Sequence, residues 1–172
     1  MARTEVTTTR RELTLAVQPM TEHDLLEVVE IENTAGLSPW GWDAYHRELQ
    51  LGSDVIMLVA RSPVFEGSER AGNLILGFIV ARLIADDVHV NNIAVRAEFR
   101  RSGTAAKLIE AVLEWGRGRR AMRALLEVRA GNTAAQALYQ RWGFQVAGRR
   151  RNYYRDPVED ALLMSVSLLS EP

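Results

Sequence analysis

Short apolar runs alternate with helix-like patterns along this chain, and that alternation limits the folds that it can adopt. The clearest helix pattern covers Thr104–Trp115, where apolar residues recur three and four positions apart, and Gly116 and Gly118 are expected to end it. Apolar strand patterns precede this helix at Val88–Val95 and follow it at Ala124–Val128. Strands that alternate with helices in this way are typical of an α/β domain with a mixed sheet.

The remaining patterns complete an order of about seven strands and four helices. Thr21, with Asp24 three residues later, resembles a capping box at the start of one helix, and Asn132 is placed to cap another. We expect strands at residues 13–18, 55–60, 74–83, 88–95, 124–128, 144–153 and 161–168, and helices at residues 21–33, 43–51, 104–115 and 132–142. The length of 172 residues suits one packed core, so we predict a flexible leader at residues 1–12 and a single domain at residues 13–170.

The composition excludes several classes of protein. The chain has no cysteine, which rules out a disulfide scaffold, a cysteine nucleophile and a thiolate metal site. His23, His46 and His89 are scattered without the spacing of metal ligands, so no metal is expected. No apolar run approaches the ~20 residues that cross a bilayer, so we expect no membrane contact and a cytoplasmic location.

Charge is distributed unevenly along the chain, although the net charge is only −1. Residues 96–155 carry 14 basic and 4 acidic side chains, whereas residues 1–95 carry 7 basic and 14 acidic ones. Twenty of the 21 basic residues are arginine, whose forked guanidinium is suited to phosphate. The basic block therefore fits either a phosphorylated ligand or nucleic acid, with a solvated arginine-rich surface as the alternative.

The loop between the strand at 88–95 and the helix at 104–115 has the features of a phosphate site. It reads Arg100-Arg101-Ser102-Gly103-Thr104-Ala105-Ala106. A helix N-terminus leaves backbone N–H groups unpaired, Gly103 lets the backbone approach a ligand, and the two arginines add charge-assisted contacts. The loop lacks both the Gly-Lys-Ser/Thr of a nucleoside triphosphate loop and the GxGxxG of a dinucleotide fold.

Three polar residues farther along the chain each have a structural and a functional interpretation. Glu127 lies inside an apolar strand pattern, where a buried carboxylate needs partners, and an exposed or edge-strand charge is the alternative. Tyr139 shares a helix face with Trp142, so it can equally be a core aromatic residue. Asn132 is explained as a helix cap.

Several motifs occur in a fixed order over the second half of the chain. They are Asn92-Ile93-Ala94-Val95, Arg100–Ala105, Leu126–Asn132, Ala137-Leu138-Tyr139, Gly143-Phe144 and Arg150-Arg151-Asn152-Tyr153-Tyr154. Together they resemble the GNAT superfamily of N-acetyltransferases, and within it the bacterial ribosomal-protein-alanine N-acetyltransferases. The resemblance covers most of residues 13–168 in element order and is densest over residues 88–154. It implies one GNAT-type domain with helices on both faces of the sheet and a parallel strand pair that splays apart.

The resemblance implies that acetyl-CoA is the co-substrate and assigns residues to it. Main-chain groups of Ile93, Ala94 and Val95 would pair with the pantetheine arm, and Asn132 would make a further contact with CoA. The pyrophosphate would lie on the loop formed by Arg100, Arg101, Ser102, Gly103, Thr104, Ala105 and Ala106. The sequence departs from the family pattern at Ala105, where glycine is commoner, and at Ser102, where arginine or glycine is frequent.

The resemblance also implies the chemistry, which is direct attack of an amine on the thioester. Glu127 matches the family's general base and Tyr139 its general acid. The expected acceptor is the α-amine of a protein N-terminus, that of an alanine in a small-subunit ribosomal protein. A peptide α-amine has a pKa of only ~7.7–8.0, which makes its deprotonation by a carboxylate feasible.

Four further residues are candidates for contact with the acceptor. Pro39 and Trp40 match a loop near the family's acceptor cleft, and Tyr153 and Tyr154 fall in the loop that faces it; packing is the alternative for Trp40. The acidic pair at 86–87 is predicted to attract a cationic peptide. We expect the protein to act as a monomer, without direct binding of nucleic acid.

Two other functions remain open from the sequence. One is acetylation of lysine side chains or small-molecule amines. The other is a non-catalytic ribosome- or RNA-binding module that uses the arginine-rich segment, which predicts salt-dependent RNA affinity. The sequence argues against the second, because its arginines bracket a CoA-type loop and no RNA-recognition signature accompanies them.

Overall fold

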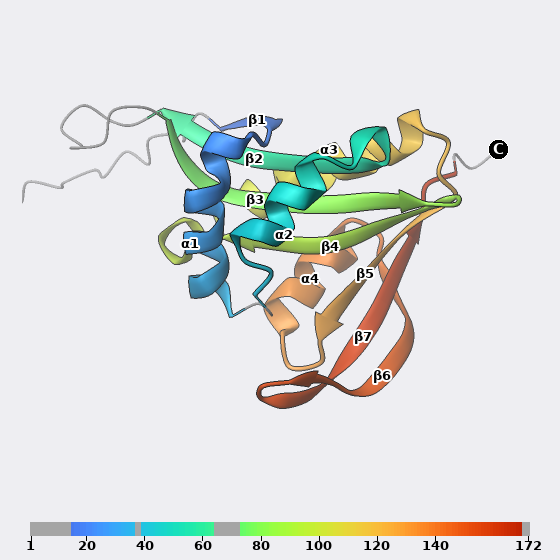
Figure 1. Ribbon diagram of the computed structural model, residues 1–172. Coiled ribbons are helices and arrows are strands. Elements are labelled where there is room, and N and C mark those ends of the chain that lie inside the picture. The colour runs from blue at the N-terminus through green and yellow to red at the C-terminus, as the bar shows by residue number, and fades with distance from the viewer. Residues whose placement is uncertain (1–14, 37–38, 64–72, 170–172) are drawn as a thin grey trace, which may run out of the picture.

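The computed structural model describes residues 15–36, 39–63 and 73–169, and its strands form one seven-stranded sheet (Figure 1). The strands are β1 (Ala16–Pro19), β2 (Val55–Pro63), β3 (Asn73–Ile84), β4 (Asp87–Val95), β5 (Arg123–Arg129), β6 (Gln145–Arg155) and β7 (Val158–Ser167). The α-helices are α1 (Leu25–Ala35), α2 (Trp42–Leu49), α3 (Thr104–Gly118) and α4 (Thr133–Arg141). The order β1-β2-β3-β4-β5-β7-β6, antiparallel except between β4 and β5, confirms the predicted mixed α/β sheet.

Two sequence predictions fall partly or wholly on residues outside the described ranges. The predicted leader at residues 1–12 lies outside them entirely. The predicted strand at 13–18 corresponds to β1, which begins at Ala16 and pairs with β2.

Local capping signals set two helix starts as predicted. The Thr21 backbone N–H donates to Asp24 Oδ2 at 2.8 Å, which forms the capping box ahead of α1. Asn132 Oδ1 accepts a hydrogen bond from the Ala135 N–H at 3.1 Å and is the N-cap of α4.

Helix α3 continues through Gly116 to Gly118, so the prediction that Gly116 ends it is wrong. A Cβ atom at this position would lie 2.8 Å from Val88 Cγ2 and 2.9 Å from Leu168 Cδ1. The missing side chain therefore allows close packing of α3 on the sheet, and this requirement comes from residues distant in sequence.

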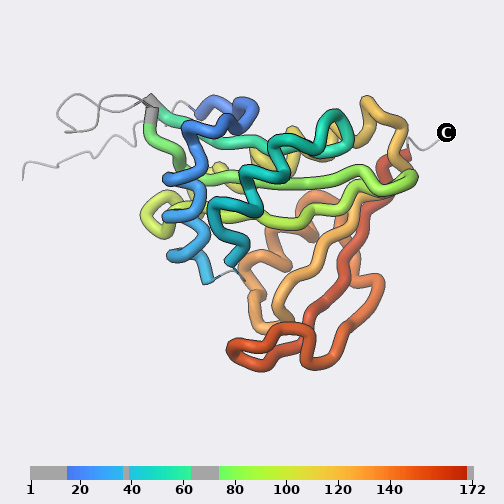
Figure 2. Tube along the Cα trace, viewed as in Figure 1, coloured from blue at the N-terminus to red at the C-terminus, as the bar shows by residue number. Residues whose placement is uncertain are grey.

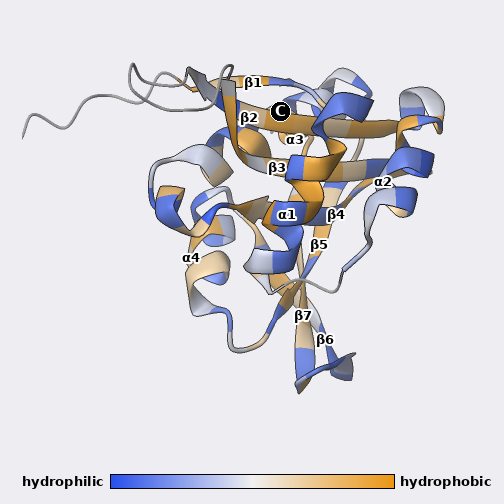
Figure 3. Cartoon of the chain, turned by 60° about the vertical axis from the view of Figure 1, so that its left-hand side comes forward, coloured by the Kyte–Doolittle hydropathy of each residue, from blue (hydrophilic) through white to orange (hydrophobic). Residues whose placement is uncertain are grey.

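The helices cover both faces of the sheet, as predicted. Alternate residues of β3 point to opposite faces. Phe78 and Val80 pack in one hydrophobic cluster with α1 and α2, whereas Ile79 and Ala81 pack in the other with α3 and α4. Figure 3 shows hydrophobic residues along the central strands β2 and β3 and hydrophilic residues at the tip of the β6–β7 hairpin.

The parallel pair splays apart beyond its first residues. Strand β4 pairs with β5 only over Asp87–Val90 opposite Arg123–Leu126. Both strands continue, to Val95 and Arg129 respectively, and diverge as they do so (Figure 2). The predicted splayed strand pair is therefore confirmed.

A β-bulge at Asn91 lies at the point where β4 leaves β5. Ala81 of β3 pairs with Val90 and Val80 pairs with Asn92, so Asn91 is the extra residue. A bulge bends its strand and increases the local twist, which accounts for the divergence from β5. It also shifts the side-chain alternation, since Val90 before it and Ile93 after it both pack on the α3 side of the sheet.

Candidate active site

The splay brings one carboxylate to the opening between β4 and β5. Glu127 directly follows Leu126, the last residue of β5 that pairs with β4. Leu126 and Val128 pack in the cluster beneath α3 and α4, so Glu127 points to the opposite face of the sheet. Its side chain is 24% exposed and lies 3.1 Å from Arg150, measured between Oε1 and Nη1. Glu127 is thus a partly buried carboxylate with a cationic neighbour.

Two tyrosines of β6 lie around this carboxylate. Tyr153 donates its hydroxyl hydrogen to Glu127, and this hydrogen bond raises the pKa of Tyr153. Burial, followed by the negative charge of Glu127, raises the pKa of Tyr154. The two rings meet edge to face at 5.2 Å between centroids. The structure therefore places both predicted acceptor-facing tyrosines beside Glu127.

Arg129 and Glu159 support Tyr154 from β5 and β7. The Arg129 guanidinium lies over the Tyr154 ring at 4.2 Å from its centroid. Arg129 also pairs with Glu159 at 3.2 Å, and Glu159 accepts a hydrogen bond from the Gly131 N–H at 2.6 Å. These contacts join the start of the α4 loop to the β6–β7 hairpin, so the position of Tyr154 is fixed from two sides.

Tyr139 of α4 is the other predicted catalytic residue, and it lies close to this group. Its side chain is buried, and its ring packs on Phe144 at 5.9 Å between centroids. Burial, with a smaller contribution from Tyr154, raises the pKa of Tyr139 to about 12. No residue of the described ranges accepts or donates a hydrogen bond at its hydroxyl. Tyr139 is therefore a core aromatic residue, and it also carries a protonated hydroxyl close to Tyr154, which lies beside Glu127.

The loop before α3 has the form expected of an anion site. Arg101 and Gly103 adopt positive φ angles of 60° and 86°, and α3 begins at the next residue, Thr104. Lys107 is the first residue whose N–H bonds back to the loop, at Gly103. Within the described residues, the backbone N–H groups of residues 101–106 have no backbone acceptor. A row of free N–H groups at the start of a fifteen-residue helix suits phosphate.

Some side chains of this loop are exposed to solvent, and others form hydrogen bonds within the loop. Arg100 and Arg101 are exposed, so their guanidinium groups are open to a ligand. The Ser102 hydroxyl donates to the Phe99 carbonyl at 2.5 Å and meets the Thr104 hydroxyl at 2.7 Å, which ties the loop to itself. Ala105 and Ala106 are half-buried in the first turn.

The backbone of β4 beyond Asn91 has one free edge. Asn92, Ile93, Ala94 and Val95 pair with β3 on one side, and no strand of the described ranges pairs with them on the other. Alternate residues of a strand direct their N–H and C=O groups to opposite edges, so half of these groups point into the splay. An extended ligand can add to this edge as a strand would.

A buried network joins the α1–α2 connection to β4. Glu32 is fully buried and accepts hydrogen bonds from the Trp40 N–H at 2.8 Å, the Gly41 N–H at 3.0 Å and the Tyr45 hydroxyl at 2.6 Å. Asn92 Nδ2 donates to Glu32 at 3.2 Å and to the Tyr45 hydroxyl at 2.6 Å. Trp40 is therefore held against α1 and β4, next to the free strand edge.

The remaining predicted residues are only partly brought together. Trp40 lies on the same face of the sheet as Glu127, because it packs with the α1–α2 cluster. Pro39 is exposed, and Asn132 is exposed and occupied as a cap. Asp87 pairs with Arg123 at 2.9 Å, at the end of β4 opposite to the splay. This pair therefore lies away from Glu127, and its attraction of the peptide stays a prediction.

Sequence reasoning missed the supporting residues Glu32, Arg129 and Glu159. The sequence did contain a signal for Glu32. Counted from Val28, Ile31 and Glu32 are at positions i+3 and i+4, so Glu32 lies on the apolar face of its helix. Glu159 had none, because its role depends on pairing across 30 residues with Arg129. Among the described residues, no cluster of candidate metal ligands occurs and no helix is long and apolar enough to cross a membrane.

Known proteins resemble this chain in sequence and in fold. Residues 25–144 match the Acetyltransferase (GNAT) family. A Bacillus subtilis protein, provisionally named a ribosomal protein bS18-alanine N-acetyltransferase, is 35% identical over 153 residues, which span 89% of this chain and 95% of that one. The crystal structure of the ribosomal-protein-S18-alanine N-acetyltransferase from Escherichia coli has a TM-score of 0.76 at 27% identity, covering 92% of this chain and 97% of that one. Arabidopsis thaliana NAA60 in complex with acetyl-CoA shares the fold, with a TM-score of 0.75 at 21% identity over 90% and 98% of the two chains.

Proposed function

Because this chain belongs to the GNAT acetyltransferase family and is an acetyl-CoA-dependent N-acetyltransferase, we propose that it acetylates the N-terminal alanine of ribosomal protein bS18. The Bacillus subtilis and Escherichia coli relatives both carry this activity in their names, and each matches about nine tenths of this chain. The observation that carries the proposal is the position of Glu127, one residue beyond the last parallel pair and facing the open side of the sheet. A carboxylate in that place can receive the proton of an amine that enters the splay.

The chain has groups that fit the pyrophosphate and the pantetheine arm of acetyl-CoA. The free N–H groups of residues 101–106, with Arg100 and Arg101, would hold the pyrophosphate. The free edge of β4 at Ile93, Ala94 and Val95 would hold the pantetheine arm by main-chain hydrogen bonds. Asn132 lies at the start of α4 and would supply a further contact through its side-chain NH₂ group, because the cap uses only Oδ1 and the backbone N–H donates to Arg129.

Glu127 would act as general base on the acceptor amine. Acetyl-CoA supplies the acetyl group as a thioester, so a carbon–nitrogen bond forms as the carbon–sulfur bond breaks. The amine must lose one proton to become neutral in the product amide, and Glu127 takes it directly or through one water. Arg150 is 58% exposed at its side chain, so it can move into solvent as the acceptor approaches.

Tyr139 would act as general acid toward the departing thiolate. Its hydroxyl stays protonated at neutral pH, since burial raises the pKa of Tyr139 to about 12. A protonated hydroxyl without a partner among the described residues is free to donate to sulfur. The proton that Glu127 has taken then returns to solvent, and the tyrosine regains its own.

The test compares acceptors and variants. Wild-type protein and acetyl-CoA are incubated with an Ala-initiated peptide of the bS18 N-terminus, and with the same peptide N-acetylated and carrying an internal lysine. We expect mass spectrometry to find one acetyl group on the first peptide only. Acetylation of the lysine peptide at an equal or higher rate would favour the alternative, in which lysine side chains or small-molecule amines are acceptors.

Two isosteric variants test the residue roles. We expect Glu127→Gln and Tyr139→Phe each to lower kcat by about 10²-fold or more, the size of a lost general base or acid. Glu114→Gln is the matched control, because Glu114 is exposed on α3 and lies on the opposite side of the sheet. A Glu127→Gln protein that keeps more than half of the wild-type kcat would contradict the assignment of the base.

A further inference from the structure

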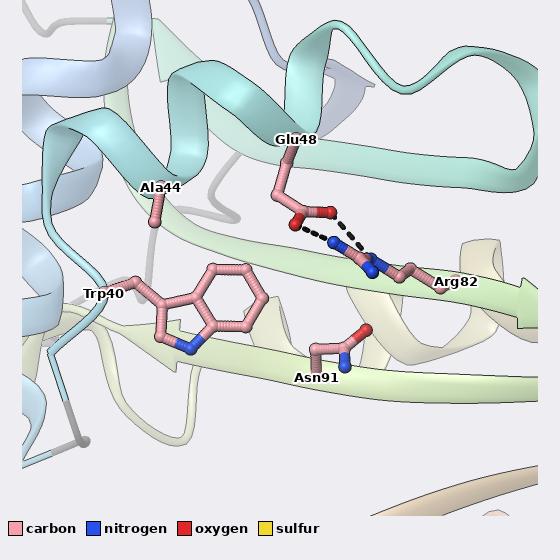
Figure 4. Close-up of a pocket in the computed structure, with 5 residues that line it drawn as sticks. All are labelled: Trp40, Ala44, Glu48, Arg82 and Asn91. Carbon is pink, nitrogen blue, oxygen red and sulfur yellow. Dashed lines mark hydrogen bonds and ion pairs between the residues drawn. The ribbon is translucent and has the colours of Figure 1, made fainter.

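A cavity of about 340 Å³ lies between α2 and the strands β3 and β4. Five residues line it: Trp40, Ala44, Glu48, Arg82 and Asn91 (Figure 4). Glu48 faces it from α2, Asn91 from β4, and Trp40 and Arg82 from its two sides (Figure 4). Of these five residues, only Trp40 was a candidate from the sequence, and none of the proposed catalytic residues lines the cavity.

The cavity and Glu127 lie on the same face of the sheet and next to each other. Val90 and Leu126 form the last parallel pair, so Asn91 and Glu127 are the first residues beyond it on β4 and β5. Arg82 of β3 pairs with His89, which pairs with Leu125 of β5, so Arg82 lies two strand spacings across and two residues along from Glu127, or about 12 Å away. An extended peptide covers that distance with about four residues.

The groups in the cavity favour an uncharged partner that offers hydrogen-bond acceptors. Arg82 binds both carboxylate oxygens of Glu48 in a fork, with Nε to Oε2 at 2.8 Å, so the two charges neutralise each other. Three donors have no partner among the described residues: the Arg82 Nη1 group, the Trp40 indole N–H and the Asn91 amide. Peptide carbonyl oxygens are acceptors without charge, and they occur at every residue of a chain.

The walls of the cavity are held in place before any ligand binds. Glu32 accepts the Trp40 N–H, and the Trp40 ring packs on Tyr45 at 5.4 Å between centroids. Glu48 is 7% exposed and paired, which fixes the plane of the Arg82 guanidinium. Preformed donors lose little conformational entropy on binding, so their hydrogen bonds contribute more to affinity.

We propose that this cavity is a subsite for the main chain of the acceptor, taking the residues that follow the reacting α-amine. The proposal rests on the proposed function, because it requires a peptide whose amine lies at Glu127. It predicts that the enzyme distinguishes a protein N-terminus from a small amine by the length of chain beyond the amine. Side chains of the acceptor contribute less than its carbonyl groups.

The experiment measures kcat/KM for acceptors of increasing length: alaninamide, and peptide amides of two, four and six residues that begin with alanine. We expect kcat/KM to rise at least tenfold between alaninamide and the four-residue amide and to level off thereafter. In Ala44→Phe, which fills the cavity, and Asn91→Ala, which removes a donor at an exposed position, the ratio between these two acceptors falls at least fivefold. Arg47→Phe is the matched control, since it adds the same ring at an exposed position of the same helix.

The outcomes separate this subsite from the proposed function. If wild-type protein acetylates none of the alanine acceptors, both are refuted. If it acetylates them with no dependence on length, or with a dependence that Ala44→Phe leaves intact, the subsite is refuted and the proposed function stands. Far-UV circular dichroism and thermal melts verify that each variant is folded, and Asn91→Ala keeps the test decisive if Ala44→Phe is not.

Discussion

Exchange of Glu32 for glutamine tests whether the buried network positions the acceptor side of the site. Oε1 of Glu32 accepts from Trp40, Tyr45 and Asn92, while Oε2 accepts from the Gly41 N–H at 3.0 Å. In Glu32→Gln an amide NH₂ replaces one oxygen. If it replaces Oε2, two donors face each other at Gly41 and the connection that carries Trp40 must move.

The size of the effect follows from the hydrogen bonds that are changed. A hydrogen bond to a charged group contributes about 1.5–3 kcal/mol, and a buried donor left unpaired costs about 1–3 kcal/mol. Loss of one such bond, with weakening of the other three, lowers the free energy of unfolding by about 3–4 kcal/mol. For a domain of this size that corresponds to a fall in Tm of about 6–15 °C.

Asp24→Asn is the matched control for this change. Asp24 is also a buried carboxylate beside α1, and it accepts hydrogen bonds from the Thr21 N–H at 2.8 Å and from Arg61 at 2.6 Å. Its loss destabilises the protein to a similar degree but leaves the network at Trp40 intact. Both variants therefore replace a buried, hydrogen-bonded carboxylate, but only Glu32→Gln changes the contacts of the connection that carries Trp40.

The assay combines thermal unfolding with steady-state kinetics at 20 °C, well below both melting temperatures. We expect Glu32→Gln to raise KM for an Ala-initiated peptide about tenfold, which is ~1.4 kcal/mol of lost binding, with an unchanged Kd for acetyl-CoA by titration calorimetry. Asp24→Asn changes neither. Equal peptide KM values in the two variants would refute the positioning role and leave Glu32 as a purely structural residue.

Two further predictions concern the loop before α3 and the tyrosines. Gly103→Ala adds no contact, since nothing lies within 4 Å of the new Cβ, but its φ of +86° disfavours alanine by about 1–2 kcal/mol. We expect the Kd for acetyl-CoA to rise about fivefold by calorimetry, with Gly118→Ala unchanged; equal values would argue against the loop as the pyrophosphate site. All four tyrosines have raised pKa values, that of Tyr139 about 12, so at pH 10 the folded protein should absorb less at 295 nm than the urea-unfolded chain. Above pH 10 the unfolded chain binds fewer protons than the folded protein, so stability falls as pH rises toward 12, and a native titration midpoint at 10 would contradict this.

Local patterns predicted the elements well because each depends on a few neighbouring residues. The capping box at Thr21, the cap at Asn132 and the amphipathic helix from Thr104 are all encoded within about one or two helical turns. The position of Gly116 was misread for the opposite reason. Gly116 allows Val88 and Leu168 to pack closely against α3, and neither residue is near it in the sequence.

The sequence identified single candidate residues of the site, but local patterns could not predict how these residues are arranged in space. Glu127 was visible as a carboxylate in an apolar strand, and the structure places the tyrosines of β6 beside it and Tyr139 close to Tyr154. Arg129 and Glu159, which hold the hairpin, became recognisable only through their pairing across the sheet. The acidic pair at 86–87 could be recognised from its charge, but only the strand register shows that it lies at the end of β4 opposite to the splay.

By itself the sequence determined the alternation of strands and helices, the helix caps and the residue types suited to phosphate and proton transfer, because these follow from periodicity and chemistry over short spans. Only the tertiary structure decided where β4 leaves β5. The bulge at Asn91 depends on the register between β3 and β4. Register is set by how two strands pair, so it cannot be read from the sequence of either strand alone. The Glu32 network, which joins residues 60 positions apart at Asn92, is likewise a product of packing. It is this long-range fit that places a strand edge and a carboxylate at one opening, with the cavity at Asn91 beside them.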